Sequence, residues 1–198
     1  MTNKQMSSKD RLISSGTLLF SEKGYAAVSV REICKHAETS MSMIHHYFKN
    51  KEGLLETIVD QFTAKTFALP MQLISKPSDS KQDFKFRIEM IFEATLDVCI
   101  LERDVLLVII REQCSNLLVV DFQKGFIKFI EQAQQKGFVR KELDASMISG
   151  FMMDRIVNQV QFAPQIKQDF KTDLLGDPIY KKRWMLANLD LLLNGMVS

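Results

Sequence analysis

The sequence has little of what disulfide-bonded and membrane-spanning proteins need. Its 198 residues contain only three cysteines, and the odd number and irregular spacing of Cys34, Cys99 and Cys114 argue against a disulfide framework. The longest uncharged apolar run, residues 105–110, is far shorter than the roughly 20 residues of a spanning helix. No N-terminal apolar run resembles a signal peptide. We therefore expect a cytoplasmic protein with reduced thiols and no membrane partner.

Motifs for catalysis and cofactor binding are also missing. The sequence contains no nucleophile elbow, no paired-carboxylate pattern and no glycine-rich phosphate loop, and most of its eight glycines fall at expected helix ends. Cys34 and His36 would point about 200° apart on a helix, so they would not converge on one metal ion. These absences predict a protein that is not an enzyme and that holds neither a cofactor nor a metal.

Positive charge is concentrated at the N-terminus. Residues 1–51 contain eight Lys and Arg against four Asp and Glu, a net charge of +4, whereas the rest has 18 against 20, a net charge of −2. A local basic excess favours contact with the phosphates of nucleic acid. The 46% hydrophobic content over 198 residues is enough for two unequal helical domains.

The same basic segment contains the pattern of two short helices joined by a tight turn. Ser29 and Glu32 have the spacing of a capping box, so a helix should begin near Val30. The polar residues 38–40 interrupt it, and Ser40 is placed to cap a second helix that ends at Phe48. This pattern predicts a helix-turn-helix.

The second helix of this pair has an unusual surface. Ile44 and Phe48 share one face and should be buried. The other faces carry polar, aromatic and methionine side chains, namely Met41, Ser42, Met43, His45 and His46. Such a surface indicates a partner, although an exposed solvated face remains the alternative for the two histidines.

Three segments together resemble the DNA-binding domain of the TetR family of bacterial regulators. They are Leu-Phe-Ser-Glu-Lys-Gly-Tyr at residues 19–25, Ser-Val-Arg-Glu-Ile at residues 29–33, and His-Tyr-Phe-Lys-Asn-Lys-Glu-Gly-Leu-Leu at residues 46–55. An amphipathic helix over residues 11–24, ended by Gly24, precedes the pair. The resemblance covers about a quarter of the chain.

The resemblance implies a set of DNA contacts. Phosphate oxygens would be contacted by Ser29, Ser40, Tyr47 and Lys51, and the major groove would be faced by Met41, Ser42, Met43, His45 and His46. Three residues depart from the common family pattern: Glu38 replaces a glycine in the turn, Met41 a polar residue, and His45 a tyrosine. The fold tolerates these changes, but the base preference of relatives cannot be transferred to this chain.

The rest of the chain has helical periodicity. We expect one helix from Asn50 until Pro70 bends or ends it, and another beyond the break at residues 75–80. Further helices are expected through residues 105–110 and 117–120, along an apolar stripe at residues 122–133 that ends at 136–137, and over residues 145–162 and 178–197. The apolar runs at 105–110 and 117–120 also suit buried strands, but the 3.6-residue period around them favours helices. The predicted fold is all-α, with a three-helix DNA-binding helix-turn-helix domain (residues 1–50) followed by a larger helical effector-binding and dimerisation domain (residues 51–198).

Two sets of residues in the larger domain are candidates for further sites. Aromatic side chains with a few polar groups predict a ligand pocket lined by Phe67, Phe92, Gln113, Phe126, Phe129, Phe151 and Asn158. Apolar faces on the last two helices predict a dimer interface of Ile148, Met152, Ile156, Val160, Trp184, Ala187, Leu191 and Leu192. The alternatives are an ordinary core for the aromatic residues, and the dimer interface or the surface for the polar ones.

The sequence therefore predicts a homodimeric, ligand-responsive transcriptional regulator, most simply a repressor. Its partners would be double-stranded DNA with a palindromic operator and a small, largely apolar effector that releases the DNA. The effector part rests on the family resemblance alone. Two functions of other classes stay open, namely a helical adaptor that binds protein and a small-molecule-binding enzyme.

Overall fold

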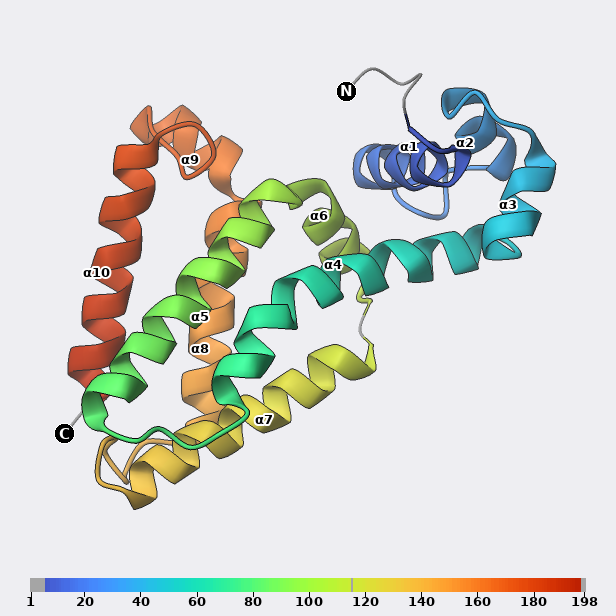
Figure 1. The fold of residues 1–198 in the computed structure, drawn as a ribbon. Coiled ribbons are helices and arrows are strands. Elements are labelled where there is room, and N and C mark those ends of the chain that lie inside the picture. The colour runs from blue at the N-terminus through green and yellow to red at the C-terminus, as the bar shows by residue number, and fades with distance from the viewer. Residues whose placement is uncertain (1–5, 115, 197–198) are drawn as a thin grey trace. The chain divides into compact units, whose positions relative to one another are not determined.

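The computed structural model describes residues 6–114 and 116–196, and these residues form ten helices (Figure 1). They are α1 (Ser8–Lys23), α2 (Val30–His36), α3 (Met41–Phe48), α4 (Lys51–Ile74), α5 (Lys81–Leu101), α6 (Arg103–Glu112), α7 (Leu117–Gln135), α8 (Ala145–Gln161), α9 (Ala163–Phe170) and α10 (Pro178–Met196). No strand occurs in the described ranges. The all-α prediction is confirmed, including the helical assignment of residues 105–110 and 117–120.

Side chains of Ser and Asp fix where several helices begin. Caps that accept a backbone N–H hydrogen bond are Ser7, Ser29, Ser80, Asp144 and Asp177. The Ser146 hydroxyl and two backbone N–H groups hold the pKa of Asp144 below its ordinary value. Backbone and Thr172 hydrogen bonds lower the pKa of Asp177 in the same way. These caps supply acceptors for amides that a helix start leaves unpaired.

The chain packs as two compact units. Unit 1 contains Met1–Ala64 and Asp104–Asn116, and unit 2 contains Lys65–Arg103 and Leu117–Ser198. Helix α4 contributes its first part to unit 1 and its last part to unit 2. The predicted boundary at residue 50 follows the sequence pattern, whereas packing adds part of α4 and nearly all of α6 to the N-terminal helices.

Unit 1 has a small apolar core among α1, α2, α3 and the first part of α4. Leu12, Phe20, Ile33 and Ile44 have at most 1% of their surface exposed. At Gly16 of α1, an added Cβ would lie 2.9 Å from the Leu54 side chain of α4. A side chain at position 16 would therefore require the end of the Leu54 side chain to shift.

Unit 2 has a core rich in phenylalanine. Its buried rings come from several helices, and five of them form a chain of ring contacts with centroids 4.5 to 6.5 Å apart: Phe67, Phe122, Phe126, Phe129 and Phe84. A separate contact joins Phe92 of α5 to Trp184 of α10. Helix α8 packs against both α5 and α7. Apolar and aromatic burial of this extent is the main stabilising term of the unit.

One helix runs past the proline at which it was predicted to bend or end, and another ends where it was predicted to. Helix α4 continues through Pro70 to Ile74, because the buried side chains of Phe67 and Ile74 hold the helical path although proline lacks an N–H to donate. The helix predicted over residues 145–162 is α8, which ends at Gln161, and Pro164 lies in the first turn of the short helix α9, where a missing N–H costs nothing. Within the described residues, no helix is both long and apolar enough to cross a membrane.

Candidate nucleic-acid interface

Helices α2 and α3 form the predicted helix-turn-helix. The Ser29 hydroxyl accepts a hydrogen bond from the Glu32 amide at 3.1 Å, which confirms the predicted start of α2. The Glu32 carboxylate does not complete the capping box, because it pairs with Lys23 of α1 at 2.5 Å. The hydrogen bond from Lys23 holds the pKa of Glu32 below its ordinary value, and Glu32 raises the pKa of Lys23. The pair links the end of α1 to α2.

The turn between the two helices has a strained residue and an internal support. Glu38 has a φ of +51°, in the left-handed region that glycine adopts at lower cost. The Arg11 guanidinium of α1 donates to the Ala37 carbonyl at 2.9 Å and lies 3.5 Å from the Glu38 carbonyl. Arg11 therefore holds in place the turn and the carbonyl of Ala37, the residue that caps the end of α2, a role that the sequence pattern did not reveal.

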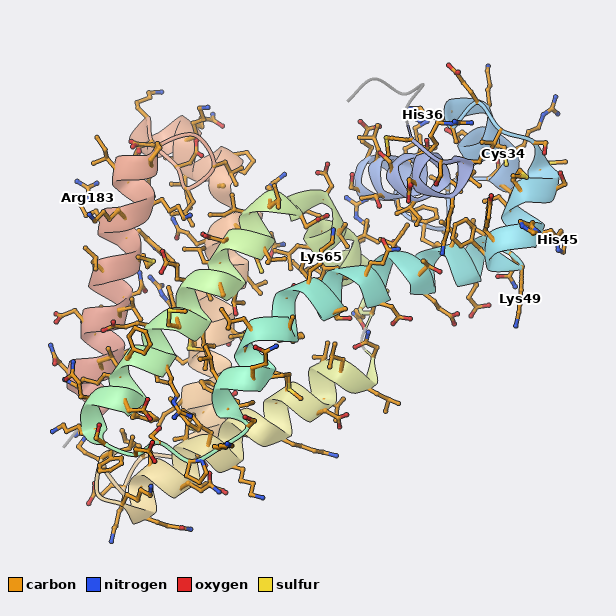
Figure 2. All side chains as sticks on the ribbon, in the orientation of Figure 1. Cys34, His36, His45, Lys49, Lys65 and Arg183 are labelled. Carbon is orange, nitrogen blue, oxygen red and sulfur yellow. The ribbon has the colours of Figure 1, made fainter. Side chains whose placement is uncertain are left out.

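Helix α3 presents most of its predicted contact residues to solvent. Ile44 and Phe48 are buried as predicted. The exposed set comprises Met41, Ser42, His45, His46 and Tyr47, whereas Met43 is half-buried. Met41 has 58% of its surface exposed. Figure 2 shows His45 and Lys49 projecting from α3 away from the helices that support it.

Ser40 does not cap α3 as predicted. Its side chain makes no capping hydrogen bond, and its hydroxyl lies 2.7 Å from the hydroxyl of Ser42. The two hydroxyls satisfy each other, so the prediction that the Ser40 side chain caps the helix was wrong. Both residues remain exposed at the start of α3, beside the amides of its first turn.

The junction between α3 and α4 is tightly built. Lys49 ends α3 with a φ of +68°, and the Asn50 side chain then accepts from the Gly53 amide at 2.8 Å, which caps α4 where this helix was predicted to begin. A Cβ at Gly53 would lie 2.0 Å from the Phe48 carbonyl oxygen. Backbone cannot rotate away as a side chain can, so position 53 requires glycine for α4 to begin where it does.

Lys51 is not free to reach outward. Its ammonium group donates to the carbonyls of Tyr25 and Val28, each at 2.9 Å, and lies 4.1 Å from the centroid of the Tyr25 ring. Lys51, which was predicted to contact a DNA phosphate, thus contacts two backbone carbonyls and an aromatic ring inside unit 1. Partial burial, followed by the nearby carboxylates, raises the pKa of Tyr25.

The end of α6 also contacts the N-terminal helices. The Glu112 carboxylate accepts a hydrogen bond from the Tyr25 amide at 3.0 Å, and Arg111 donates to the Phe20 carbonyl at 3.4 Å. Gly24, which lies between Phe20 and Tyr25 in the sequence, has a φ of +84°, which a glycine adopts without strain. Sequence reasoning missed both α6 residues, because a contact across about 90 positions leaves no local pattern.

The histidines and cysteines do not form a metal site in the described part of the chain, where no group of three metal-ligating side chains converges. His36 is bonded through Nδ1 to the Ser15 hydroxyl at 2.9 Å. Burial raises the pKa of the Cys99 thiol to about 12 and also raises that of Cys34. Both thiols therefore stay protonated and unreactive at neutral pH.

The residues predicted to line a ligand pocket do not form one group. Phe67, Phe92, Phe126 and Phe129 are buried in unit 2, but Phe151 has half of its surface exposed. Of the two polar members, Gln113 belongs to unit 1, and the exposed Asn158 donates to the carbonyl of Asp154 on its own helix. The buried phenylalanines are the predicted pocket residues that share the core of one unit.

The predicted dimer residues also divide into two groups. Buried inside the protomer are Met152, Ile156, Val160, Trp184 and Leu192. Ile148 is half-buried, whereas Ala187 and Leu191 are exposed. The opposite faces of α8 and α10 carry the exposed apolar surface: Met147, Phe151 and Leu191 have 75%, 50% and 70% of their surfaces exposed. They border a groove of about 480 Å³.

The exposed set follows from helical geometry. Met147 and Phe151 lie four residues apart on α8, as do Ala187 and Leu191 on α10. The sequence places apolar residues on more than one face of each helix. Protomer packing takes up Met152, Ile156 and Val160 of the predicted set, whereas Ala187 and Leu191 lie on the exposed face of α10.

Comparison with known proteins connects this interface to bacterial regulators. A family model described as bacterial regulatory proteins, tetR family, matches residues 12–58. The Probable HTH-type transcriptional regulator YttP of Bacillus subtilis (strain 168) is 40% identical over 81 residues, which span 39% of each chain. The HTH-type transcriptional regulator UidR of Escherichia coli (strain K12) is 24% identical over 162 residues, covering 78% of this chain and 80% of UidR.

Solved structures share the fold over nearly the whole chain. The ketosteroid transcriptional regulator KstR2 of Mycobacterium tuberculosis superimposes with a TM-score of 0.72 and 17% identity, covering 97% of this chain and 96% of that one. PfmR of Thermus thermophilus, a TetR family transcriptional regulator, gives a TM-score of 0.71 and 16% identity over 95% and 96% of the two chains. The similarity therefore extends beyond the DNA-binding segment to the arrangement of the C-terminal helices.

Proposed function

The chain belongs to the TetR family of bacterial regulatory proteins, and from this premise we propose that it is a homodimeric repressor released from a palindromic operator by a small, largely apolar effector. The family assignment makes it a ligand-responsive, DNA-binding transcriptional regulator. The observation that carries the DNA-binding role is α3, a helix anchored by Ile44 and Phe48 that exposes Met41, Ser42 and His45.

We propose that α3 enters the major groove and reads mainly apolar features there. The exposed start of the helix has no Arg or Lys for bidentate contact with guanine, so Met41 and the half-buried Met43 would contact thymine methyl groups. Hydrogen bonding to bases would fall to Ser42, His45 and His46. Ser29, Ser40 and Tyr47 would hold the register through phosphate oxygens, which fix position without carrying sequence information.

We propose a dimer formed through the exposed faces of α8 and α10. Met147, Phe151 and Leu191 form an apolar surface larger than the isolated exposed residues that monomers carry. A twofold interface buries the same surface on both protomers. It would set two copies of α3 about 34 to 36 Å apart, the spacing of successive major-groove faces on one side of the duplex.

We propose that the effector binds among the buried phenylalanines of unit 2. Phe67 belongs to α4, whose first residues follow α3 directly, so a change at the aromatic core would move the same helix that begins beside the DNA-reading motif. Coupling of two sites through such an element is worth about 1 to 3 kcal/mol. Support for an apolar effector comes from KstR2, which is described as a ketosteroid transcriptional regulator.

The rival functions gain no support from the relatives named above, which are transcriptional regulators rather than adaptors or enzymes. Action in the cytoplasm follows from the proposal, because promoter DNA is found there.

Selection of bound sequences from a random duplex pool tests the proposed function. We expect an enriched palindrome whose half-sites are rich in A·T opposite Met41 and Met43, with affinity that falls steeply as salt rises. Recovery of no common sequence, together with salt-insensitive binding, would refute the regulator function. A selected site with G·C at both positions that is insensitive to Met41→Ala would refute only the proposed mode of reading.

A further inference from the structure

Lys51 is the first residue of α4 and lies beside the segment that joins α1 to α2. Its Nζ donates to the Tyr25 and Val28 carbonyl oxygens, both at 2.9 Å. The same atom lies 4.1 Å from the centroid of the Tyr25 ring, within cation–π range. Two of the three protons of the ammonium group are thus used by backbone acceptors within the protein.

Moving this charge to a DNA phosphate would carry a cost on the protein side. Hydrogen bonds from a charged donor are roughly twice as strong as neutral ones. Val28 is 2% exposed, so its carbonyl would lose a partner in a site where water has little access. The side chain would also leave the Tyr25 ring. A phosphate contact would have to compensate for all three losses.

The two carbonyls that Lys51 binds are well placed to orient the DNA-reading motif. Val28 directly precedes Ser29, the cap of α2, and Lys51 follows the junction that ends α3. Lys51 therefore joins the entrance of the helix-turn-helix to the helix that leaves it. On the other side of the same turn, the Tyr25 amide donates to Glu112 of α6, so one residue is held through both its N–H and its C=O group.

Lys49 offers a contrast within the same loop. It is exposed at the end of α3, and its side chain projects outward in Figure 2. Its position places a positive charge on the surface that carries His45 and Tyr47. The two lysines are separated by one residue but differ in surroundings, one engaged with backbone carbonyls and the other open to solvent.

We propose that Lys51 is a positioning residue for DNA binding, which acts through the Tyr25 and Val28 carbonyls, and that Lys49 supplies the phosphate contact at this end of α3. The proposal rests on the DNA-binding function above and replaces the phosphate role that the family resemblance implies for Lys51. Lys51 then supports the protein from inside, and Lys49 contacts the DNA.

The salt dependence of binding separates these tasks. A lysine that neutralises a phosphate contributes about 0.9 to the slope of log affinity against log salt, whereas an internal lysine contributes nothing to it. We would measure binding of wild type, Lys51→Met and Lys49→Met to one short random-sequence duplex over a series of salt concentrations. Methionine keeps an unbranched apolar stem and removes the charge in both variants.

For Lys49→Met we expect the slope to fall by about one per protomer. For Lys51→Met we expect an unchanged slope and an affinity lowered by roughly tenfold at every salt concentration. The helix-turn-helix would be misplaced in this variant, but no charge that contacts a phosphate would be lost. A reduced slope in Lys51→Met would overturn the positioning role. A wild-type protein that bound no duplex even at low salt would instead refute the DNA-binding function.

Amine labelling of the wild-type protein decides the question even where the Lys51→Met protein fails to fold. With an acetylating reagent and peptide mass spectrometry, we expect Lys51 to react more slowly than Lys49 in the free protein. Addition of the duplex should protect Lys49 and leave the rate at Lys51 unchanged. Equal rates in the free protein, followed by protection of Lys51 on DNA, would contradict the proposal.

Discussion

Substitution of Gly53 by alanine should disrupt the α3–α4 junction out of proportion to the size of a methyl group. The added Cβ would lie 2.0 Å from the Phe48 carbonyl oxygen, and contacts under 3.0 Å are essentially never observed, so the backbone must separate by about 1 Å. Overpacking of this kind costs up to about 3 kcal/mol. The higher helix propensity of alanine returns about 1 kcal/mol, which leaves a net loss of about 2 kcal/mol.

Hydrogen exchange measures this loss where it occurs. The Gly53 amide donates to the Asn50 side chain and the Leu54 amide to the Asn50 carbonyl, so both report on the start of α4. A loss of about 2 kcal/mol should speed their exchange by a factor of about thirty. Because Phe48 anchors α3, DNA affinity should fall together with protection.

Gly150→Ala is the matched control, because an added Cβ there meets nothing within 4 Å in the interior of α8. It should leave the exchange of residues 44–58 unchanged and stabilise its own helix slightly. If Gly53→Ala showed wild-type exchange and wild-type DNA affinity, the steric argument for glycine at this junction would be wrong.

Three further predictions follow from the caps, the turn and the exposed helix faces. Glu38→Gly should raise the thermal midpoint, since it relieves a left-handed residue worth about 1 kcal/mol, and it should tighten DNA binding more than Glu38→Gln does; a lower midpoint would contradict this. Leu191→Glu should convert the dimer to a monomer in sedimentation, and an unchanged dimer would exclude this face of α10 as the interface. The lowered pKa values of Asp144 and Asp177 contribute stability that is complete above the pKa of the unfolded chain and is lost as pH falls through the lower folded pKa. Acid unfolding of Asp144→Asn should therefore begin from a less stable state at neutral pH and depend less on pH, and a curve parallel to that of wild type would exclude the cap as a contributor.

Local sequence signals predicted the helices well. Ser29, Asn50 and Asp144 each cap the helix that was expected to begin beside them, because a cap depends on residues within one turn. Ile44 and Phe48 were correctly predicted as the buried face of α3 for a similar reason, since their spacing alone puts them on one side.

Contacts between distant segments were beyond the reach of these signals. The Tyr25 and Val28 carbonyls that Lys51 binds lie more than 20 residues earlier in the sequence. Whether Lys51 contacts these carbonyls or DNA depends on where the segment between α1 and α2 lies in the folded protein. The stripe of α8 that faces the protomer core and the stripe that faces solvent are both apolar, as Met152 and Phe151 illustrate. Burial had to be seen in the packed structure before either one could be assigned.

The attachment of α6 to the N-terminal helices sets a rule for building hybrid regulators. A chimera cut at residue 50 would carry the DNA-reading motif to a new effector domain without Glu112 and Arg111, and so without the groups that hold the Tyr25 amide and the Phe20 carbonyl. The transplanted motif would function only if the recipient's own α6 supplied an acceptor and a donor at the matching positions. The smallest DNA-binding unit that can be transferred to another protein is therefore discontinuous in sequence. A graft must carry or recreate the end of α6 together with residues 1–64.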